Sequence, residues 1–265
     1  MSQDSLAHRR ETARQFGENA RGYAVSKTHA EGGTRDLLLQ RLEPVTDETA
    51  LDAACGAGGM TLALAPFVAR VFALDLAPEM LAATRLGARR ASLANVEPIE
   101  GDVHALPFRD RALDLVTVRM APHHFEDPAA AVREMARVLR RGGRLGIADG
   151  TVPDDPALDA FINRIDVLHD PTTVRNYSAR EWRGFFETAS LRVDSLEDEA
   201  FDLAEGRLLG EWVARSAGSG VVFDAIRRLL LEAPPAIRQA LRIRPEGEDV
   251  RFDLPKVVIV GTRVD

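Results

Sequence analysis

The chain has 265 residues, 45% of them hydrophobic, and a formal net charge of -7 at neutral pH. This length suits one α/β domain, with or without a cap, and the apolar fraction is ample for a large core. The negative charge and the lack of a long basic run argue against a nucleic-acid substrate, because clustered cations drive phosphate binding.

The segment before residue 44 begins with the polar stretch MSQDSLAHRRETARQ, which lacks the apolar region of a secretory signal. No apolar run in the chain approaches membrane-spanning length. The single cysteine, Cys55, allows neither an intramolecular disulfide nor a cysteine-rich metal site. We therefore expect a cytoplasmic protein with no bound metal and no membrane insertion.

The first predicted strand, residues 50–54, runs into a turn with three glycines in the stretch LDAACGAGGMT. Glycine lets the backbone approach a ligand that a Cβ atom would hold away. The second predicted strand, residues 71–74, ends at Asp75, and an acid at that place can accept both hydrogen bonds of a ribose diol. Together the turn and the acid predict a pocket for a nucleotide-type cofactor.

The turn also indicates which cofactor. A dinucleotide fingerprint would need a third glycine where the chain has Thr61. The stretch instead resembles motif I of the class I S-adenosylmethionine (SAM) methyltransferases, hydrophobic-Asp-x-Gly-Cys-Gly-x-Gly. The matching residues are Asp52, Cys55, Gly56 and Gly58. Ala54 stands where the family usually has glycine. Because alanine is comfortable only at negative φ, we infer either a reshaped turn or a position that needs no positive φ.

Further matches follow in the family's order and cover residues 44–150. In VFALDLAPEML, Asp75 resembles the ribose-binding acid, and Pro78 opens a helix at a position suited to its fixed φ. The resemblance of GDVHALPF implies that Asp102 accepts from the adenine amino group and that Val103 offers its backbone amide. LDLVTVRMAPHHF is similar to the fourth strand and its loop. VREMARVLRRGGRLGIAD resembles a helix, a Gly142-Gly143 turn and the fifth strand.

The predicted core strands are short continuous apolar runs, typical of a parallel sheet buried on both faces. Between the fourth and fifth strands, Val132, Met135, Ala136 and Leu139 have helical spacing. Later elements are a helix over residues 154–169, a helix capped by Ser178 with Glu181 completing a capping box, a strand over 191–203, two or three helices within 205–243, and a final strand over 256–264. The family topology implies that this last strand is antiparallel, between the fifth and sixth.

The expected fold is therefore α/β: a doubly wound, mostly parallel seven-stranded sheet, Rossmann-like, with a helical cap. We predict one methyltransferase domain over residues 1–265. Its SAM-binding core comprises about 44–150, 178–203 and 250–265, and its cap segments comprise about 1–40, 151–177 and 204–248. The cap would lie above the carboxyl ends of the strands, where ligands bind in open α/β sheets.

Candidate site residues follow from this arrangement. Those for cofactor binding are Asp52, Ala54, Cys55, Gly56, Gly58, Asp75, Leu76, Met80, Gly101, Asp102, Val103 and Arg119. Asp52 is expected to be nearly buried and to shape the turn. Those for substrate contact are Tyr23, His29, His169, Arg175 and Tyr177, although each could equally be structural.

His123 and His124 leave the fourth strand toward the expected position of the reactive methyl group. One of them could polarise or deprotonate a substrate near neutral pH, or both could only pack. No residue spacing suggests a metal site, and no nucleophile elbow is present.

The resemblance implies a SAM-dependent methyltransferase, similar to the ubiquinone/menaquinone C-methyltransferase branch. It would transfer methyl to a small organic acceptor by in-line SN2 displacement, with S-adenosylhomocysteine as product. Two alternatives stay open: a SAM-binding protein without methyl transfer, and an NAD-dependent oxidoreductase, which the missing third glycine disfavours. We expect a small-molecule acceptor as partner, no nucleic acid, and a monomer or homodimer.

Overall fold

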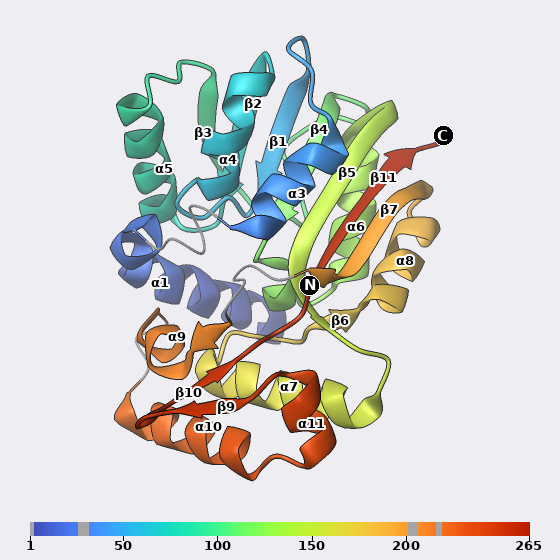
Figure 1. Cartoon of the computed structure of the whole chain (residues 1–265). Helices are drawn as coiled ribbons and strands as arrows, with labels where there is room; N and C mark the ends of the chain where they lie inside the picture. The colour runs from blue at the N-terminus through green and yellow to red at the C-terminus, as the bar shows by residue number, and fades with distance from the viewer. Residues whose placement is uncertain (1–2, 26–31, 201–205, 216–218) are drawn as a thin grey trace.

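A seven-stranded main sheet with helices on both faces forms the upper part of the molecule in Figure 1. The computed structural model describes residues 3–25, 32–200, 206–215 and 219–265. The strands, in sheet order, are β3 (Val96–Glu100), β2 (Arg70–Asp75), β1 (Thr49–Ala53), β4 (Leu113–Arg119), β5 (Leu139–Val152), β11 (Lys256–Arg263) and β7 (Leu191–Ala200). The first five pair in parallel, while β11 is antiparallel to both β5 and β7. This confirms the predicted topology.

Each face of the sheet is covered because successive strand residues alternate in direction. Val116 of β4 packs with α6 (Pro128–Val138) and α8 (Ala179–Thr188), whereas its neighbour Leu115 packs with α3 (Gly33–Leu42) and α4 (Gly59–Leu64). α5 (Pro78–Arg90) packs against β2, β3 and α4. A short 3-10 turn, η1 (Ala65–Phe67), follows α4.

Several predicted helix boundaries are confirmed. Pro78 occupies the first turn of α5, and Ser178 and Glu181 form the capping box of α8. The helix expected over 154–169 is α7 (Pro156–His169), and its N-cap Asp155 accepts from two backbone amides.

Two boundaries differ from those predicted. Leu139 was expected on the helical stripe but begins β5, with an extended backbone. The expected Gly142-Gly143 turn falls within the bounds of β5, but a break in the strand is present there: Gly142 adopts φ 75°, and the pairing with β4 shifts register between Leu139 and Arg144. Of the strand expected over 191–203, β7 covers residues up to Ala200, and 201–203 lie outside the described residues.

Below the sheet in Figure 1 lies a second group of elements with its own apolar cluster. Besides α7 it contains α9 (Leu209–Arg215), α10 (Gly220–Glu232) and α11 (Pro235–Ala240), as expected for residues 205–243. It also contains an antiparallel sheet of β8 (Arg207–Leu208), β10 (Asp249–Phe252) and β9 (Arg244–Glu246), which the sequence analysis did not predict. Val250 and Phe252 of β10 are buried in this cluster rather than in the main core.

The long helix α1 (Gln3–Val25) runs between the sheet and these lower elements (Figure 1). Residues 33–40, expected in the cap, instead belong to α3, which packs on β5 and β11 of the main sheet. A two-residue strand, β6 (Tyr177–Ser178), pairs in parallel with the end of β5. Among the described residues, no helix combines the length and apolar character needed to cross a membrane.

Candidate active site

A cavity of about 360 Å³ lies at the carboxyl ends of β1, β2 and β4, beneath α1. This size is near the lower end of the roughly 300–1,000 Å³ range of ligand pockets. The predicted site residues in its wall are Asp52, Ala54, Cys55, Gly56, Asp75, Leu76, Met80, Gly101, Asp102, Val103, Arg119 and His124. The sheet therefore brings together residues that are up to 72 positions apart, between Asp52 and His124.

The glycine turn holds Asp75 in place. The two carboxylate oxygens of Asp75 accept backbone hydrogen bonds from Gly56 (2.8 Å) and Ala77 (2.9 Å). Burial raises the pKa of Asp75, and these backbone N–H groups offset only part of that effect. A carboxylate has about four acceptor positions, so both oxygens can still accept from a ligand. Gly56 belongs to the cavity wall, and a Cβ atom added to it would meet no protein atom within 4 Å.

Ala54 adopts φ 53°, in the left-handed region. The suggestion that this position needs no positive φ was therefore wrong: the turn keeps the glycine-like conformation although alanine occupies it. For an L-residue this costs roughly 1–2 kcal/mol.

We expect Ala54→Gly to raise the free energy of unfolding by up to about 1 kcal/mol, because relief of the left-handed strain exceeds the added chain entropy of glycine. Urea denaturation measures this change. Ala53→Gly is the matched control, since Ala53 is a buried strand residue without positive φ and its replacement should destabilise. Equal destabilisation by both substitutions would contradict a strained turn.

Asp52 is fully enclosed and supports the floor of the cavity. Its carboxylate accepts hydrogen bonds from the hydroxyls of Thr61 (2.6 Å) and Thr117 (2.9 Å). Burial raises the pKa of Asp52 to about 6. The two hydroxyl bonds and the nearby charge of Arg119 lower the pKa, but they offset only part of the effect of burial. Arg119 is itself buried and donates through Nε to Thr34 (3.2 Å). Asp52 is therefore buried as expected and connects β1 to α4 and β4, while its role in shaping the turn stays a prediction.

Asp102 is held between α1 and its own loop. Its Oδ1 accepts from the backbone N–H of His104 (2.9 Å) and lies 3.0 Å from the His104 ring, while Oδ2 forms an ion pair with Arg9 of α1. Arg9 also pairs with Glu126 (3.0 Å). Burial raises the pKa of Asp102, but the bonds from His104 and the charge of Arg9 outweigh it and lower the pKa overall.

The two adjacent histidines, in the 3-10 turn η2 (Pro122–His124), have different surroundings. Both the backbone N–H and Nδ1 of His123 lie 2.7 Å from the buried carboxylate of Asp149. Burial lowers the pKa of His123, but the Asp149 charge outweighs it, so the pKa is raised. His124 lines the cavity, and its pKa is lowered by burial and by the neighbouring His123. His123 is absent from the cavity wall.

Other predicted residues lie elsewhere. Gly58 caps α4 with φ 89°, and an added Cβ there would approach the Thr84 side chain to within 2.9 Å. His169 stacks on Trp212, with ring centroids 3.8 Å apart, inside the lower cluster. Tyr23 lies in α1, where its side chain is not described, and His29 falls outside the described residues.

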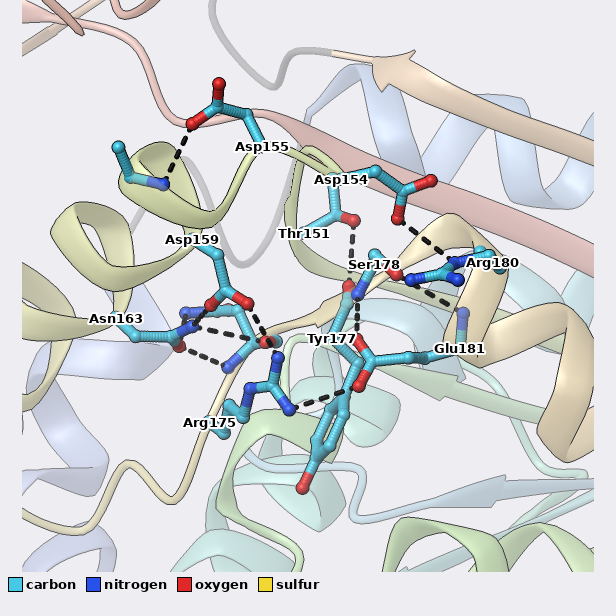
Figure 2. Close-up of polar contacts among 12 residues, drawn as sticks. Thr151, Asp154, Asp155, Asp159, Asn163, Arg175, Tyr177, Ser178, Arg180 and Glu181 are labelled. Carbon is cyan, nitrogen blue, oxygen red and sulfur yellow. Dashed lines mark hydrogen bonds and ion pairs between the residues drawn. The ribbon is translucent and has the colours of Figure 1, made fainter.

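Arg175 and Tyr177 belong to a polar network at the junction of α7 and α8, shown in Figure 2. The Arg175 guanidinium pairs with Asp159 of α7 (2.7 Å) and Glu181 of α8 (3.1 Å), and it lies over the Tyr177 ring. Neither residue reaches the cavity wall, so their expected substrate contact is replaced by a structural role.

The sequence interpretation missed several wall residues. They are His8, Arg9, Thr12, Ala13, Phe16, Arg35, Ala57, Gly59, Met60, Leu62, Ala63, Leu74, His104, Met120, Ala121, Phe125 and Glu126. One signal was available: His8, Thr12 and Phe16 recur every four residues and so share one face of a helix. Among the described residues no group of three or more side chains is placed to hold a metal ion.

This sheet order, with a glycine turn after β1 and acids after β2 and β3, is that of a Rossmann-like α/β fold, in which ligands bind at the carboxyl ends of the strands. A family model described as a methyltransferase domain matches residues 51–147. The uncharacterized methyltransferase YcgJ of Bacillus subtilis is 30% identical over 253 residues, covering 94% of this chain and 97% of YcgJ. The crystal structure of YcgJ superposes with a TM-score of 0.79 at 29% identity, covering 88% of this chain and 98% of that one.

A demethylmenaquinone methyltransferase from Corynebacterium kroppenstedtii is 32% identical over 174 residues, which cover 64% of this chain and 73% of that enzyme. The chain belongs to the class I SAM-dependent methyltransferases, and it is an enzyme of that class. The oxidoreductase alternative is therefore rejected.

Proposed function

We propose that the protein binds SAM in this cavity and transfers its methyl group to a small organic acceptor. The observation that carries the proposal is the glycine turn at Gly56. The Gly56 amide holds the carboxylate of Asp75, and no protein atom lies within 4 Å of the position that a Cβ of residue 56 would occupy. In this assignment Asp75 holds the ribose, while Asp102 and the backbone of Val103 hold the adenine. Arg35 and Arg119, both in the wall, supply positive charge for the carboxylate of the methionine part.

When bound, SAM supplies a sulfonium-activated methyl group, so the chain's residues mainly need to orient the reactants and exclude water. α1 is placed to exclude water, because His8, Thr12 and Phe16 close one side of the cavity. Its attachment is specific: Arg9 bridges Asp102 and Glu126, and the His8 ring lies 3.1 Å from the His124 carbonyl oxygen.

We place the acceptor between α1 and the loop after β4. Phe16, Met120, Ala121 and Phe125 make this part of the wall apolar, and His124 is the polar group beside them. Such a wall favours an acceptor with an apolar body and one polar reacting group. The relative from Corynebacterium is named for an acceptor of small-molecule type, which supports the proposal.

We also propose that α7, α9, α10, α11 and the small sheet of β8, β9 and β10 act as a substrate cap over a core of about residues 44–150, 178–203 and 253–265. The support is the separate apolar cluster of α7, α9, α10 and β10, which gives these elements a packing unit of their own. Of the cap segments inferred from the sequence, 151–177 and 204–248 fit this unit best.

Asp75→Ala tests the cofactor assignment. We expect the Kd for SAM and S-adenosylhomocysteine to rise about 5- to 150-fold, the equivalent of roughly 1–3 kcal/mol for loss of a charged hydrogen-bond partner. Isothermal calorimetry measures both affinities, and circular dichroism checks that the fold is retained.

Asp47→Ala is the matched control, because Asp47 is an exposed acid at the opposite end of β1 and its removal changes net charge equally. Its Kd should equal that of the wild type. Unchanged affinity in Asp75→Ala would remove the ribose role of Asp75. A wild-type protein that binds neither ligand would overturn the site assignment as a whole.

A further inference from the structure

A buried chain of hydrogen bonds leads from α1 to His124. Asp170, at the end of α7, accepts through Oδ1 from the side chain of Gln15 (2.7 Å) and from the backbone and hydroxyl of Thr172 (2.9 and 2.7 Å). The Thr172 hydroxyl oxygen lies 3.2 Å from Nδ1 of His124. Asp170, Thr172 and His124 are all buried, so water does not compete for these bonds.

The number of protons available decides which group donates and which accepts in each of these hydrogen bonds. Burial raises the pKa of Asp170, but His124, Thr172 and Gln15 outweigh it and lower the pKa, so the carboxylate is ionised and can only accept. The one hydroxyl proton of Thr172 therefore goes to Asp170. Thr172 must then accept from Nδ1–H of His124, which leaves Nε2 of the neutral ring with a free lone pair.

The ring of His124 forms part of the cavity wall. Its Nδ1 is turned to the Thr172 hydroxyl, and the ring is also hydrogen-bonded to the backbone of Thr172. The ring is held edge-on to Phe16, with centroids 4.9 Å apart, and lies 4.0 Å from the ring of His123. The charged or titratable groups around it are Asp170, His8, His123 and the Asp149 that pairs with His123.

We propose that Nε2 of His124 accepts the proton that the acceptor loses on methylation, and that Thr172 and Asp170 are positioning residues that fix this tautomer. The acceptor is then a nucleophile that carries a proton at the methylated atom: a hydroxyl, an N–H or an activated C–H. The electron pair of that atom forms the bond to the methyl carbon, the carbon–sulfur pair stays on sulfur, and the proton passes to Nε2. This inference rests on the proposed function.

Nitrogen-15 NMR of the imidazole rings shows which nitrogen of His124 carries the proton, and it needs no methyl-acceptor substrate. The protein has six histidines, and His124 is assigned by its loss in His124→Gln or, if that variant does not fold, by its ring contact with Phe16. We expect the wild-type His124 ring at neutral pH to carry its proton on Nδ1. Thr172→Val removes the hydroxyl that accepts this proton and keeps the Thr172 backbone, so the population of the Nε2–H tautomer should increase.

Thr173→Val is the matched control, because Thr173 is buried in the same loop and its hydroxyl makes no hydrogen bond to a described residue. It should leave the His124 signals unchanged. A wild-type ring protonated on Nε2, or a tautomer that does not respond to Thr172→Val, would overturn the proposal. Calorimetry with S-adenosylhomocysteine reports on the cofactor site separately, so failure of this proposal and failure of the proposed function remain distinguishable.

Discussion

Replacing Asp149 with alanine is expected to lower the free energy of unfolding by about 3–5 kcal/mol, the cost of removing one partner of a buried ion pair. Asp149 is 1% exposed, and it accepts two bonds from His123, through the backbone N–H and Nδ1, each 2.7 Å long. Without the carboxylate, both donors of His123 lose their acceptor inside the protein. Urea denaturation monitored by Trp fluorescence gives the change in unfolding free energy.

The effect should depend on pH. The pKa of His123 is raised above 6.5, so its contribution to stability is fully present below that pH and is lost as the pH rises through the folded pKa. Burial raises the pKa of Asp149, but His123 and Lys256 outweigh it, so the pKa is lowered below 3.8. Its contribution is therefore present above pH 3.8 and lost as the pH falls through the folded value. The difference in the free energy of unfolding between the wild type and Asp149→Ala should be larger at pH 6 than at pH 9.

Asp154→Ala is a suitable control for this experiment. Asp154 pairs with Arg180 at 3.4 Å on the surface, where both side chains are largely exposed (Figure 2). An exposed pair contributes only about 0–1 kcal/mol. If Asp149→Ala were as mild as Asp154→Ala, the pair with His123 would not be a buried structural unit.

The features that the sequence predicted well are those encoded by short local patterns. Continuous apolar runs such as residues 71–74 specify buried parallel strands, because both of their faces are covered. The turn after β1 could be placed from its glycines, and Asp75 from its position at the end of the next strand. The carboxyl ends of parallel strands meet at one edge of the sheet, so a pocket there follows from the strand order.

The remaining parts of the site depend on contacts between distant segments, which no local pattern encodes. Arg9 reaches Asp102 across 93 positions, and Thr172 reaches His124 across 48. The helical periodicity of α1 could be read, but not which residues its polar face would meet. The small sheet of β8, β9 and β10 was missed because two- to four-residue strands are too short to show alternation.

The adjacent histidines illustrate the same limit. The sequence placed both after the fourth strand but could not separate their roles, because neighbouring residues often point in different directions. Asp149 decides the role of His123, and it lies 26 positions away on β5. The expectation that one of the two histidines acts near neutral pH also changes, since the pKa of His124 is lowered by burial and by His123.

His124→Gln should lower turnover about 10²- to 10⁴-fold, the usual contribution of a positioned general base. Glutamine keeps a polar side chain at the cavity wall, so the affinity for SAM should change little. His123→Gln provides the comparison: it should reduce stability through the loss of its bond to Asp149, while turnover at a temperature where it is folded stays within about tenfold of wild type. A methyl acceptor is first sought among apolar compounds that bear a hydroxyl, N–H or activated C–H group. The release of S-adenosylhomocysteine with that acceptor then gives the turnover rates of both variants.

The pH profile separates a base from a packing residue. Because burial and the neighbouring His123 lower the pKa of His124 to about 3, the wild-type rate should be level at neutral pH, where the ring is unprotonated, and should fall only in strongly acidic solution. His124→Gln should lose this acid limb, whereas His123→Gln should keep it. If the double variant His123→Gln with His124→Gln turned over at the wild-type rate, proton transfer by either histidine would be ruled out, and alignment of the reactants alone would have to account for catalysis.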